Sequence, residues 1–518
     1  MKQSRDEVRV RFAPSPTGYM HVGNFRSALY DYLFAKKHGG VFVLRIEDTD
    51  RKRFVDGAVE SLVKILSSFG IRPDEGVMWE NDGVTEKGSS GPYVQSKRLD
   101  LYRRYVDELV ADGKAYRCFC SPERLEDVRA EQTKNGQAPK YDRHCLHLSE
   151  EEVRKNMEAG QRHVIRMIVP DDRDIAFTDL VRGEVRFHSR DVDDQVLMKS
   201  DGFPTYHLAN VVDDHLMGIT HVIRGEEWLS STPKHVLLYE AFGWEAPEFA
   251  HLPLLLNPDR SKLSKRQGDV AVEDYLAKGY LPEAIINFVA LLGWNPGQGS
   301  TQEIFSLEEL VNRFDLSGVN KSGAVFDQKK LDWMNAEYIK RLSVDELYER
   351  ALPFLSEKKF FKEWRMENGE CLPETLRVAK QAESDADVDV FVKRVLTVEQ
   401  DRLVKLADVG DENPFFFVGP TVEKAMLPWK KSTEAGAKEA LGRALDILLS
   451  VADADWSRER LGEILLEAAG DDRGGFLWPL RVALSGKEKS PPPSDIAWII
   501  GRGSTLSRIK SASDVLGG

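Results

Sequence analysis

Residues 8–46 decide the fold, and they read VRVRFAPSPTGYMHVGNFRSALYDYLFAKKHGGVFVLRI. Apolar and charged residues alternate over 8–12, which predicts a strand, and the Pro- and Gly-rich run after it predicts a loop. A helical pattern then runs from Gly23 to a Gly-Gly pair, and a continuous apolar run over 41–46 predicts a buried strand. A strand, a helix and a buried strand in this order predict a parallel α/β sheet, with a ligand at the carboxyl ends of its strands.

This alternation of strands and helices is interrupted after about residue 94 and resumes near residue 205. The interval contains a helix over 96–112, a cluster of cysteines and hairpin-like strands around Arg182-Gly183. The resumed pattern predicts alternating helices and strands, over 205–216, 219–224, 232–243 and 252–256. Beyond about residue 340 the pattern is helical, most clearly over 437–451 and 461–468. The sequence therefore predicts an α/β Rossmann-like domain split by an α+β insertion and followed by an all-α C-terminal region.

The composition is that of a globular protein with several domains. Of 518 residues, 42% are hydrophobic and 30% are charged, and no run approaches the roughly twenty apolar residues of a membrane span. The segment Met1 to Glu7 is charged and lacks an apolar run, so neither a signal peptide nor a transit peptide is expected. Four cysteines do not make a secreted disulfide framework, and we expect a cytoplasmic protein that does not enter membranes.

The formal net charge of −13 argues against a protein that coats nucleic acid without specificity. Local basic patches, rather than the net charge, decide whether an RNA can bind, so a specific RNA partner is compatible with this sequence. Composition alone goes no further than a soluble protein of several domains.

A phosphate-binding element is expected where the first loop enters the first helix, at His21-Val22-Gly23-Asn24. A helix N-terminus offers unpaired N–H groups and a partial positive charge, which suit a phosphate. Gly23 would let a nucleotide approach the backbone closely, and His21 and Asn24 could donate to phosphate oxygens. On its own, however, this tetrapeptide is more often a loop histidine followed by an Asn helix cap.

A second basic motif, Lys262-Leu263-Ser264-Lys265-Arg266, lies in a polar loop between Asn257 and Gly268. Several cations on a loop that closes over a nucleotide would stabilise the charge that builds on the α-phosphate and the pyrophosphate. Without other evidence, such a motif is usually a solvated basic loop.

In this order, and on the two sides of the insertion, the two motifs resemble the signature pair of class I aminoacyl-tRNA synthetases. His-Val-Gly-Asn stands where that class has His-Ile-Gly-His, and Lys-Leu-Ser-Lys-Arg where it has Lys-Met-Ser-Lys-Ser. Asn24, Leu263 and Arg266 depart from the class pattern but are variants typical of the glutamyl branch. Longer strings also look like glutamyl-tRNA synthetase, namely RFAPSPTG over 11–18, RIEDTD over 45–50, YHLANVVDDH over 206–215 and VIRGEEW over 222–228. The chain is identified as a member of the bacterial-type glutamyl-tRNA synthetase family, with a resemblance that is dense over about residues 8–340 and weaker beyond.

The resemblance implies a division of the chain into four regions. Residues 1–93 and 205–256 form the Rossmann-like catalytic domain, and 94–204 form an insertion that binds the acceptor end of tRNA and carries a zinc site. Residues 257–340 form a stem-contact region with the Lys-Leu-Ser-Lys-Arg loop, and 341–518 form an all-α anticodon-binding region. The resemblance also implies ATP, L-glutamate and tRNA(Glu) as substrates, Mg²⁺ as the accompanying ion, and a monomer.

The implied activity is that of a glutamate–tRNA ligase, which joins glutamate to AMP and then transfers it to the terminal adenosine of tRNA. By motif matching, the catalytic residues are His21, Lys262 and Lys265. The residues expected to bind ATP are His21, Gly23, Asn24, Lys262, Ser264 and Lys265. Positioning and electrostatics, rather than a covalent nucleophile, would supply the rate.

Glutamate brings two carboxylates and one ammonium, so its pocket should hold cations and one acid. By resemblance, Arg11 and Arg224 fall at carboxylate-binding positions and Glu47 at the position that holds the α-ammonium. Hydrogen-bonding support is implied for Ser15, Tyr206 and Asn210. A single arginine of this kind is usually part of a surface ion pair, and it is the whole set that favours a binding site.

Two short pairs, Cys118-Phe119-Cys120 and Cys145-Leu146-His147, are separated by 24 residues. Alternation along a strand puts Cys118 and Cys120 on one face, and the second pair could complete a tetrahedral site of three sulfurs and one nitrogen. Small buried thiols without a metal would give the same pattern, and His144 could replace His147. The resemblance to glutamyl enzymes that carry this motif favours one structural zinc ion per chain. Cys371 stands apart and is expected to be inert.

Two parts of the chain are candidates for contact with tRNA. The helix over 96–112 could follow an acceptor stem through its cationic and aromatic residues, which are Lys97, Arg98, Tyr102, Arg103, Arg104 and Tyr105. Half of these side chains must instead face the core. In the C-terminal region, Arg402 matches a family arginine that inspects the third anticodon base.

Several alternatives to this function stay open. A non-discriminating enzyme would also charge tRNA(Gln), and a glutaminyl-tRNA synthetase would show β-barrel periodicity over 341–518, which is helical instead. A truncated paralogue that glutamylates a modified tRNA base lacks an anticodon-binding half. A small-molecule nucleotidylyltransferase has no use for so long a helical extension, and a non-catalytic RNA-binding paralogue should have lost His21 or Lys265.

Overall fold

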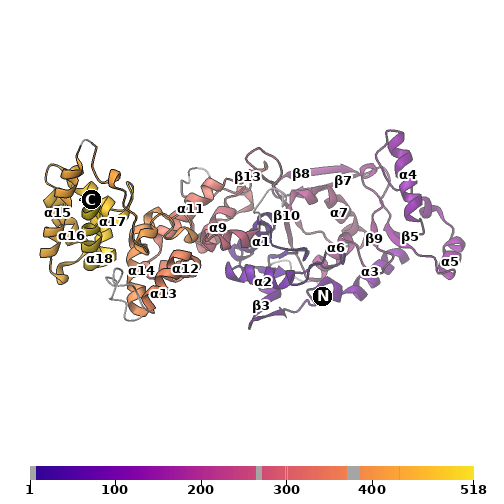
Figure 1. Ribbon diagram of the computed structural model, residues 1–518. Coiled ribbons are helices and arrows are strands. Elements are labelled where there is room, and N and C mark those ends of the chain that lie inside the picture. The colour runs from indigo at the N-terminus through magenta and orange to yellow at the C-terminus, as the bar shows by residue number, and fades with distance from the viewer. Residues whose placement is uncertain are drawn as a thin grey trace. The chain divides into compact units, whose positions relative to one another are not determined.

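The computed structural model describes residues 7–263, 271–297, 299, 301–369, 385–430 and 432–517. Contacts between Cα atoms divide the chain into two units, Met1–Tyr275 with Pro282–Gln328 and Leu276–Leu281 with Lys329–Gly518. Figure 1 labels the helices and strands of both units. Two of the motifs named above, Ser264-Lys265-Arg266 and Cys371, lie outside the described residues.

The first unit is built on an eight-stranded sheet in the order β4-β3-β2-β1-β10-β11-β7-β8. Its strands are β1 (Arg9–Phe12), β2 (Val41–Leu44), β3 (Glu75–Glu80), β4 (Gly83–Lys87), β7 (Asp174–Asp179), β8 (Gly183–His188), β10 (His221–Gly225) and β11 (Glu248–Leu252). Pairing is parallel from β3 to β7 and antiparallel only at the two edges, β3–β4 and β7–β8. The predicted parallel α/β sheet is confirmed.

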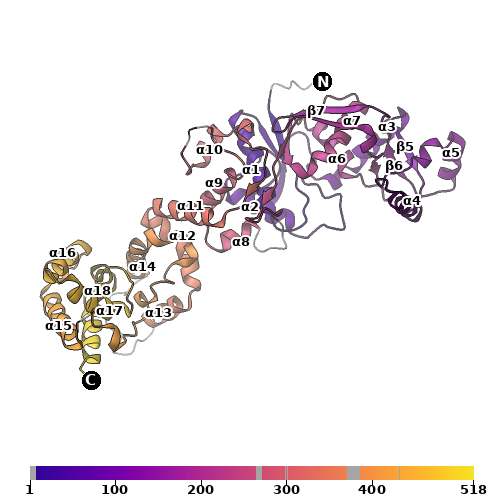
Figure 2. The same cartoon turned by 90° about the horizontal axis from the view of Figure 1, so that it is seen from above.

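Two crossovers run outward from the centre of this sheet in opposite directions. The connection from β1 to β2 passes through α1 (Val22–Lys37), and the connection from β10 to β11 passes through α7 (Thr232–Ala241). Because such crossovers are right-handed, the two helices must lie on opposite faces. Figure 2 shows α1 and α2 (Ala58–Ser68) on one side, with α7 and α6 (Tyr206–Leu216) on the other. The strand order therefore reverses between β1 and β10, and a ligand crevice is expected at their carboxyl ends.

The interval between the two halves of the large sheet holds a small antiparallel sheet in the order β5-β6-β9. Its elements are β5 (Ala115–Cys118), β6 (Val164–Met167) and β9 (Val196–Met198), together with α3 (Leu99–Ala111), α4 (Pro122–Lys134) and α5 (Glu150–Glu158). Ser121 caps α4 through the Arg124 N–H, and Ser149 with Glu152 forms a capping box on α5. An α+β insertion is confirmed.

The hairpin predicted around Arg182-Gly183 forms, as β7–β8, but it is part of the large sheet. Asp179 at the end of β7 lies opposite Phe249 of β11, and the Leu180 N–H donates to the Phe249 carbonyl at 2.8 Å. The rings of Phe177 and Phe249 meet edge to face with centroids 5.7 Å apart. This pairing covers the outer edge of β11, which periodicity within the hairpin could not reveal.

The apolar run predicted as one strand over 252–256 is divided in two. β11 ends at Leu252 and β12 (Leu255–Leu256) follows, because Pro253 has no N–H to continue the ladder. β12 pairs in parallel with β13 (Ala324–Val325). Three short helices complete the region, α8 (Val272–Ala277), α9 (Pro282–Ala290) and α10 (Leu307–Arg313), and the last two pack on α1.

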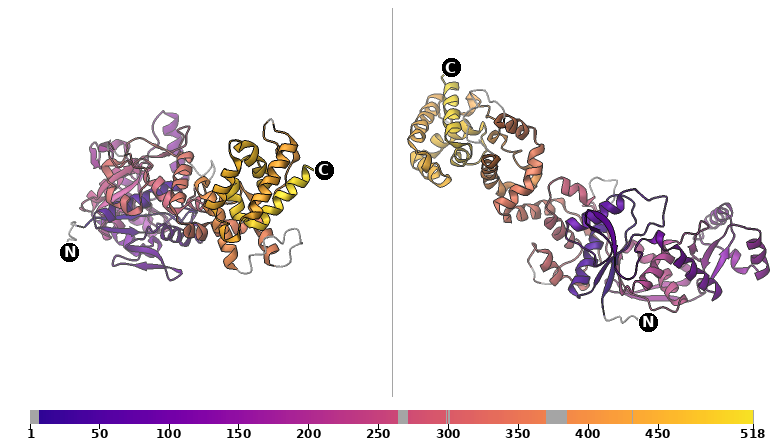
Figure 3. Two further views of the ribbon diagram at one scale, coloured as in Figure 1. Left: turned by 90° about the vertical axis from the view of Figure 1, so that its left-hand side faces the viewer. Right: turned by 90° about the horizontal axis from the view of Figure 1, so that it is seen from below.

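The second unit is helical, and its described residues contain no strand. Its first helices are α11 (Gln328–Arg341), α12 (Val344–Glu357), α13 (Lys359–Gly369) and α14 (Asp385–Glu399). The last four pack on one another, as the yellow part of Figure 3 shows: α15 (Glu434–Ser450), α16 (Arg458–Ala469), α17 (Arg473–Ser485) and α18 (Pro493–Val515). The all-α C-terminal region is confirmed. Within the described part of the chain, no helix has the length and apolar character that crossing a membrane requires.

Candidate active site and metal centre

A buried ionic cluster lies beneath the carboxyl ends of β1 and β2. Arg11 Nε donates to Asp214 Oδ1 at 3.0 Å, and Arg45 Nη1 donates to the same oxygen at 2.7 Å. Arg45 Nη2 also donates to Glu47 Oε1 at 2.9 Å. With its amide oxygen turned toward both guanidinium groups, Asn210 accepts from Arg11 Nη2 at 3.3 Å and from Arg45 Nη2 at 3.2 Å. Arg11, Glu47 and Asn210 thus meet through Asp214 and Arg45, which the motifs did not predict.

Opposing charges set the ionisation of this cluster. Burial alone would raise the pKa of Asp214, but Arg11 and Arg45 lower it below its ordinary value. For Glu47, burial outweighs the attraction of Arg45 and raises the pKa of the carboxyl. Asp214 is therefore the anion beneath the two guanidinium groups, and Glu47 is the acid whose pKa burial holds above its ordinary value.

Arg224, at the end of β10, is buried and makes contacts on every side. Its Nη1 donates to the Tyr206 hydroxyl at 3.0 Å, and its Nη2 donates to Thr232 Oγ1 at 2.9 Å. Burial raises the pKa of Tyr206, and Arg224 and Arg11 oppose this rise while Glu47 adds to it. The Tyr206 hydroxyl thus contacts one of the predicted carboxylate-binding arginines, Arg224, and the charges of Arg11 and Glu47 also act on its pKa. Ser15 lies exposed in the loop that follows β1.

The N-terminus of α1 presents the predicted phosphate-binding tetrapeptide. His21 caps the helix, and its Nδ1 accepts from the Gly23 N–H at 2.9 Å. This bond places the proton of a neutral ring on Nε2, the nitrogen that would donate to a phosphate. A Cβ at Gly23 would lie 3.2 Å from His21 Nδ1, so a larger residue would press on the ring. Asn24 is exposed on the first turn.

The chain on both sides of Ser264-Lys265-Arg266 is held close to this helix terminus. The Leu263 N–H donates to the Leu255 carbonyl at 2.9 Å, and an isolated bridge joins Lys262 to Leu256. On the far side, Ala271 forms an isolated bridge with His21, and the Val272 N–H donates to the Met20 carbonyl at 2.9 Å. The exposed side chain of Lys262, and the residues that precede and follow the basic motif, therefore lie near His21.

Two of the side chains considered for acceptor-stem contact face the core instead. Arg98, just before α3, donates to Asp213 Oδ1 at 2.7 Å, and the Tyr102 hydroxyl donates to Asp213 Oδ2 at 2.8 Å. Arg98 and Tyr102 are almost fully buried, whereas Arg103 and Arg104 are exposed. The helix thus supports the α6 segment that carries Asn210, and its solvent-facing arginines are the ones that could contact RNA.

Three of the four predicted metal ligands meet at the end of β5. The Sγ atoms of Cys118, Cys120 and Cys145 lie within 4.8 Å of one another, with 3.5 Å between those of Cys120 and Cys145. Hydrogen bonds, first from the Cys145 thiol and then from Tyr141 and Arg166, overcome burial and lower the pKa of the Cys118 thiol to about 4. A thiolate in a cluster of this size is a suitable ligand for a soft metal ion.

A hydroxyl that the motifs did not predict lies beside two of these sulfurs. The Tyr141 hydroxyl lies 3.3 Å from Cys118 Sγ and 3.4 Å from Cys120 Sγ. A tetrahedral zinc ion with its usual bond lengths spaces sulfurs about 3.8 Å apart and places an oxygen ligand about 3.5 Å from each sulfur. The four atoms therefore fit a zinc ion. His147 is exposed and is not part of the group, and His144 is exposed as well.

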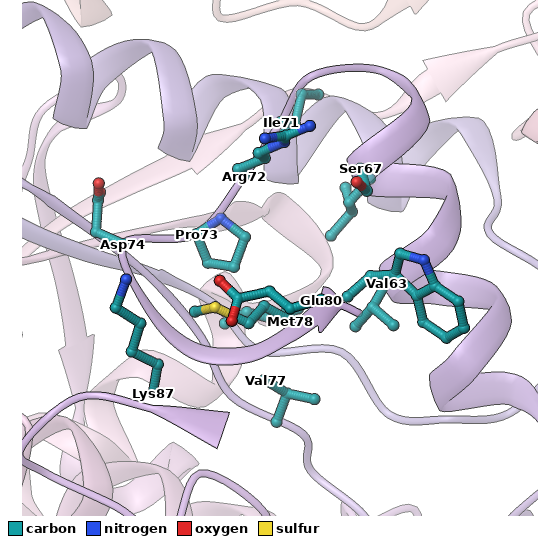
Figure 4. Close-up of a pocket in the computed structure, with 13 residues that line it drawn as sticks. Val63, Ser67, Ile71, Arg72, Pro73, Asp74, Val77, Met78, Glu80 and Lys87 are labelled. Atoms are coloured by element: carbon teal, nitrogen blue, oxygen red, sulfur yellow. The ribbon is translucent and has the colours of Figure 1, made fainter. Parts of the chain in front are cut away.

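A cavity of about 310 Å³ lies between α2 and β3, away from these residues (Figure 4). Its floor includes Val63, Val77 and Met78, and charged side chains such as Arg72 and Lys87 stand around it. None of the residues that the motifs predict for substrate or metal binding lines this cavity. The candidate site is therefore identified by the convergence of charged groups at the strand ends and not by this cavity.

In the second unit, Arg402 lies on the wall of an open cleft of about 1090 Å³. The cleft also contains the side chains of Trp478 and Asn413 and several cations, namely Arg481, Lys487 and Lys489. Arg402 is exposed and forms no hydrogen bond or ion pair with the described residues, whereas Arg481 donates to the Ser490 hydroxyl at 3.2 Å. A cationic cleft with an aromatic wall is suited to unstacked bases.

The two units match two families in sequence. Residues 7–333 match the catalytic domain of the class I tRNA synthetases (E and Q), and residues 346–513 match an anticodon binding domain. A glutamate–tRNA ligase of Chloroherpeton thalassium is 48% identical to this chain, covering 99% of each sequence. One from Alkaliphilus metalliredigens is 46% identical, covering 99% of this chain and 100% of that protein.

A solved structure gives the same result. The crystal structure of a glutamate tRNA ligase from Elizabethkingia meningosepticum, in complex with its amino acid, superposes with a TM-score of 0.83. The two sequences are 37% identical, and the match covers 98% of this chain and 100% of that one. The split parallel sheet, the strand-end cluster and the helical second unit define a class I aminoacyl-tRNA synthetase. Within that class, the chain belongs to the glutamate–tRNA ligase family.

Proposed function

We propose that this protein activates L-glutamate with ATP and esterifies it to tRNA(Glu), and that the strand-end cluster is its amino-acid pocket. The observation that carries this proposal is the buried group of charges at the strand ends, where Arg224 donates to the Tyr206 hydroxyl and hydrogen bonds through Asp214 and Arg45 link Arg11 to Glu47. Two cations match the two carboxylates of glutamate, and one acid matches its ammonium. Ser15 and Asn210 supply hydrogen bonds in the same pocket.

In the first step the α-carboxylate of glutamate attacks the α-phosphate of ATP, giving glutamyl-adenylate and pyrophosphate. His21, Gly23 and Asn24 bind the phosphates at the N-terminus of α1, while Lys262, Ser264 and Lys265 stabilise the charge that develops in the transition state. Mg²⁺ neutralises phosphate charge when bound, and it enters with the nucleotide. In the second step the 2′-hydroxyl of the terminal adenosine attacks the acyl group and releases AMP.

The four-region division predicted from the sequence describes where each part of the tRNA binds. Residues 1–93 and 205–256 activate glutamate, 94–204 receive the acceptor end, 257–340 contact the stem, and 341–518 read the anticodon. The hairpin β7–β8 belongs to the catalytic sheet although it lies within the second of these ranges. We propose that the protein acts as a cytoplasmic monomer.

The direct test is ATP–pyrophosphate exchange with glutamate, with and without each tRNA, followed by aminoacylation of tRNA(Glu) and tRNA(Gln) measured separately. We expect exchange with glutamate but not with glutamine, and transfer to tRNA(Glu). Transfer to both tRNAs would identify a non-discriminating enzyme. Exchange with glutamine as the preferred substrate would instead identify a glutaminyl-tRNA synthetase and refute the proposal.

For the metal, we propose one structural zinc ion held by Cys118, Cys120, Cys145 and Tyr141, with Tyr141 in the position predicted for His147. The ion would join β5 to the segment before α5 and so hold the acceptor-binding insertion together. With four protein ligands the site is closed, so the zinc supplies stability and no chemistry.

We expect about one equivalent of zinc in protein purified without chelator, and less than a tenth of that in Cys118→Ser. Tyr141→Phe should lower zinc affinity at least roughly 10- to 100-fold, the loss found when even an outer-shell partner is removed. His147→Ala should retain it, because the Tyr141 hydroxyl contacts two of the sulfurs whereas His147 is exposed. Metal analysis and competition with a zinc chelator measure both. If His147→Ala lost zinc affinity and Tyr141→Phe kept it, His147 would be the fourth ligand. Wild-type protein without zinc would refute the site.

For the anticodon, we propose that the cleft around Arg402 binds the unstacked bases and that Arg402 inspects the third one. We expect Arg402→Ala to lower kcat/KM for tRNA(Glu) by roughly 10- to 100-fold, the loss expected for one charged hydrogen bond to a base. Glutamate-dependent pyrophosphate exchange should be unchanged. Arg443→Ala, on α15 and outside the cleft, is the matched control, and equal effects of the two variants would contradict the assignment.

A further inference from the structure

The guanidinium of Arg224 is almost fully committed to protein acceptors. Arginine has five N–H donors and no acceptor. Nε donates to His251 Nε2 at 3.1 Å, Nη1 lies 3.0 Å from the Tyr206 hydroxyl and 3.3 Å from His235 Nδ1, and Nη2 donates to Thr232 Oγ1 at 2.9 Å. These contacts account for four donors. One N–H, on Nη2, is left without a partner among the described residues.

These contacts fix the tautomers of two buried histidines. Because Arg224 can only donate, His251 Nε2 and His235 Nδ1 must accept, and each ring carries its proton on the other nitrogen. His251 Nδ1 therefore donates to Asp179 Oδ2 at 2.6 Å. On the other side, His235 Nε2 donates to His207 Nδ1 at 3.0 Å. Two series of hydrogen bonds thus run outward from the guanidinium, the first through His251 to Asp179 and the second through His235 to His207.

The hydrogen-bond series through His251 ends at Asp179, which is itself held by backbone N–H groups. Asp179 Oδ1 accepts from the backbone N–H groups of Val181, Arg182 and His251, at 3.0, 2.8 and 3.3 Å. Burial would raise the pKa of Asp179, but the hydrogen bond from His251 and those from the backbone lower it. Asp179 is therefore an ionised carboxylate that is held by the turn between β7 and β8 through Oδ1 and by His251 of β11 through both oxygens.

Both histidines of the second hydrogen-bond series, His235 and His207, stay neutral. Burial, together with the charge of Arg224, lowers the pKa of His235 well below its ordinary value. Burial, Lys234 and Arg224 lower the pKa of His207 to about 4. The two rings therefore act at neutral pH as hydrogen-bonding groups with a fixed direction, and they do not compete with Arg224 for an anion.

We propose that His251, His235 and Asp179 are positioning residues that orient Arg224 toward the side-chain carboxylate of glutamate. They direct its remaining Nη2–H into the pocket, and they hold Nη1 against the Tyr206 oxygen so that the phenolic hydrogen also faces the substrate. A carboxylate accepts from both donors, whereas the amide nitrogen of glutamine would meet one of them with its own hydrogens. This inference rests on the proposed function and adds the source of its selectivity.

The alternative is that these side chains only stabilise the fold, and pairs of variants separate the two roles. His251→Gln and His235→Asn keep an acceptor near the nitrogen that faces Arg224, whereas His251→Leu and His235→Leu do not. We expect the leucine variants to raise the KM for glutamate by roughly 10- to 100-fold, the effect of misdirecting a charged hydrogen bond. Their kcat at saturating glutamate and their KM for ATP should stay within about threefold of the wild type.

Selectivity is the second readout, measured as the ratio of kcat/KM for glutamate to that for glutamine in pyrophosphate exchange. It should fall at least roughly tenfold in the leucine variants and be largely kept in His251→Gln and His235→Asn. The matched control is His221→Gln, on the same strand as Arg224. Its ring contacts Thr220 and Phe34 instead of the guanidinium.

Two results would overturn the inference. One is wild-type glutamate KM and selectivity in folded leucine variants, and the other is equal loss in the acceptor-keeping and leucine members of each pair. Absence of glutamate-dependent exchange in the wild-type protein, both with and without tRNA, would instead refute the proposed function, so the two failures are distinguishable. Thermal unfolding of every variant shows which of them are folded.

Discussion

Replacing Lys265 with alanine is expected to slow glutamyl-adenylate formation by roughly two to three orders of magnitude, the loss measured when one preorganised donor to a developing charge is removed. The KM for glutamate should change little, because the lysine engages the phosphates chiefly in the transition state. The chain on either side of this residue supports the assignment. Lys262 is joined to β12, and Ala271 is joined to His21 at the helix terminus proposed to bind the phosphates.

The measurement is a single-turnover experiment with saturating ATP and glutamate, in which bound adenylate is quantified. Lys134→Ala removes an exposed lysine at the end of α4 and serves as the matched control. A Lys265→Ala enzyme that forms adenylate at the control rate would show that another cation stabilises the transition state.

Replacing Arg224 with leucine is expected to abolish most of the preference for glutamate over glutamine. The variant would leave the substrate carboxylate buried without its cation, a loss of about 3–5 kcal/mol by analogy with truncated buried charge pairs. That energy corresponds to a factor of roughly 10² to 10⁴ in kcat/KM for glutamate. Activity with glutamine should change far less, because an amide does not need the charge. The KM for ATP should be nearly unchanged.

Pyrophosphate exchange with each amino acid measures this change. Arg9→Leu is the matched control, since it removes a partly buried guanidinium that is paired with Glu75, on the strand that carries Arg11. Wild-type discrimination in a folded Arg224→Leu enzyme would mean that another residue recognises the substrate side chain. The same loss in Arg9→Leu would mean that general destabilisation, rather than the pocket, is the cause.

Much of the fold followed from the sequence because its strong signals are local. The stretch over 8–46 contains a strand, a turn and a helix with clear boundaries, and each forms where expected. The pairing of β7 with β11 was not predictable in this way, since it joins Asp179 to Phe249 across the sheet. Pro253 likewise divides a run that its apolar composition alone predicts as continuous.

The candidate site, like the fold, was predictable where the signal is local in the sequence. Arg11, Arg224 and Tyr206 lie in strings that resemble a known family. In the structure Arg224 donates to the Tyr206 hydroxyl, and the charge of Arg11 also acts on the pKa of Tyr206. The contacts of Asp214, His251 and Tyr141 were not predicted, because each of them joins residues that are far apart in the chain. Spacing can place two cysteines on one strand face, but it cannot show that a tyrosine hydroxyl lies nearer to them than a histidine does.

The strand order also has a consequence for synthesis on the ribosome. The block β4-β3-β2-β1 is complete by Lys87 and the β7–β8 hairpin by His188, yet β10 and β11, which lie between them, end only at Leu252. Arg9 and Thr220, which are hydrogen-bonded across β1 and β10, are 211 residues apart. At about 5–20 residues per second, the inner edge of β1 lacks its neighbour for roughly 10–40 s. During that time the emerging chain carries open sheet edges that could pair with other chains. Those edges, on β1 and β7, are covered when β10 and β11 are made and fill the centre of the sheet.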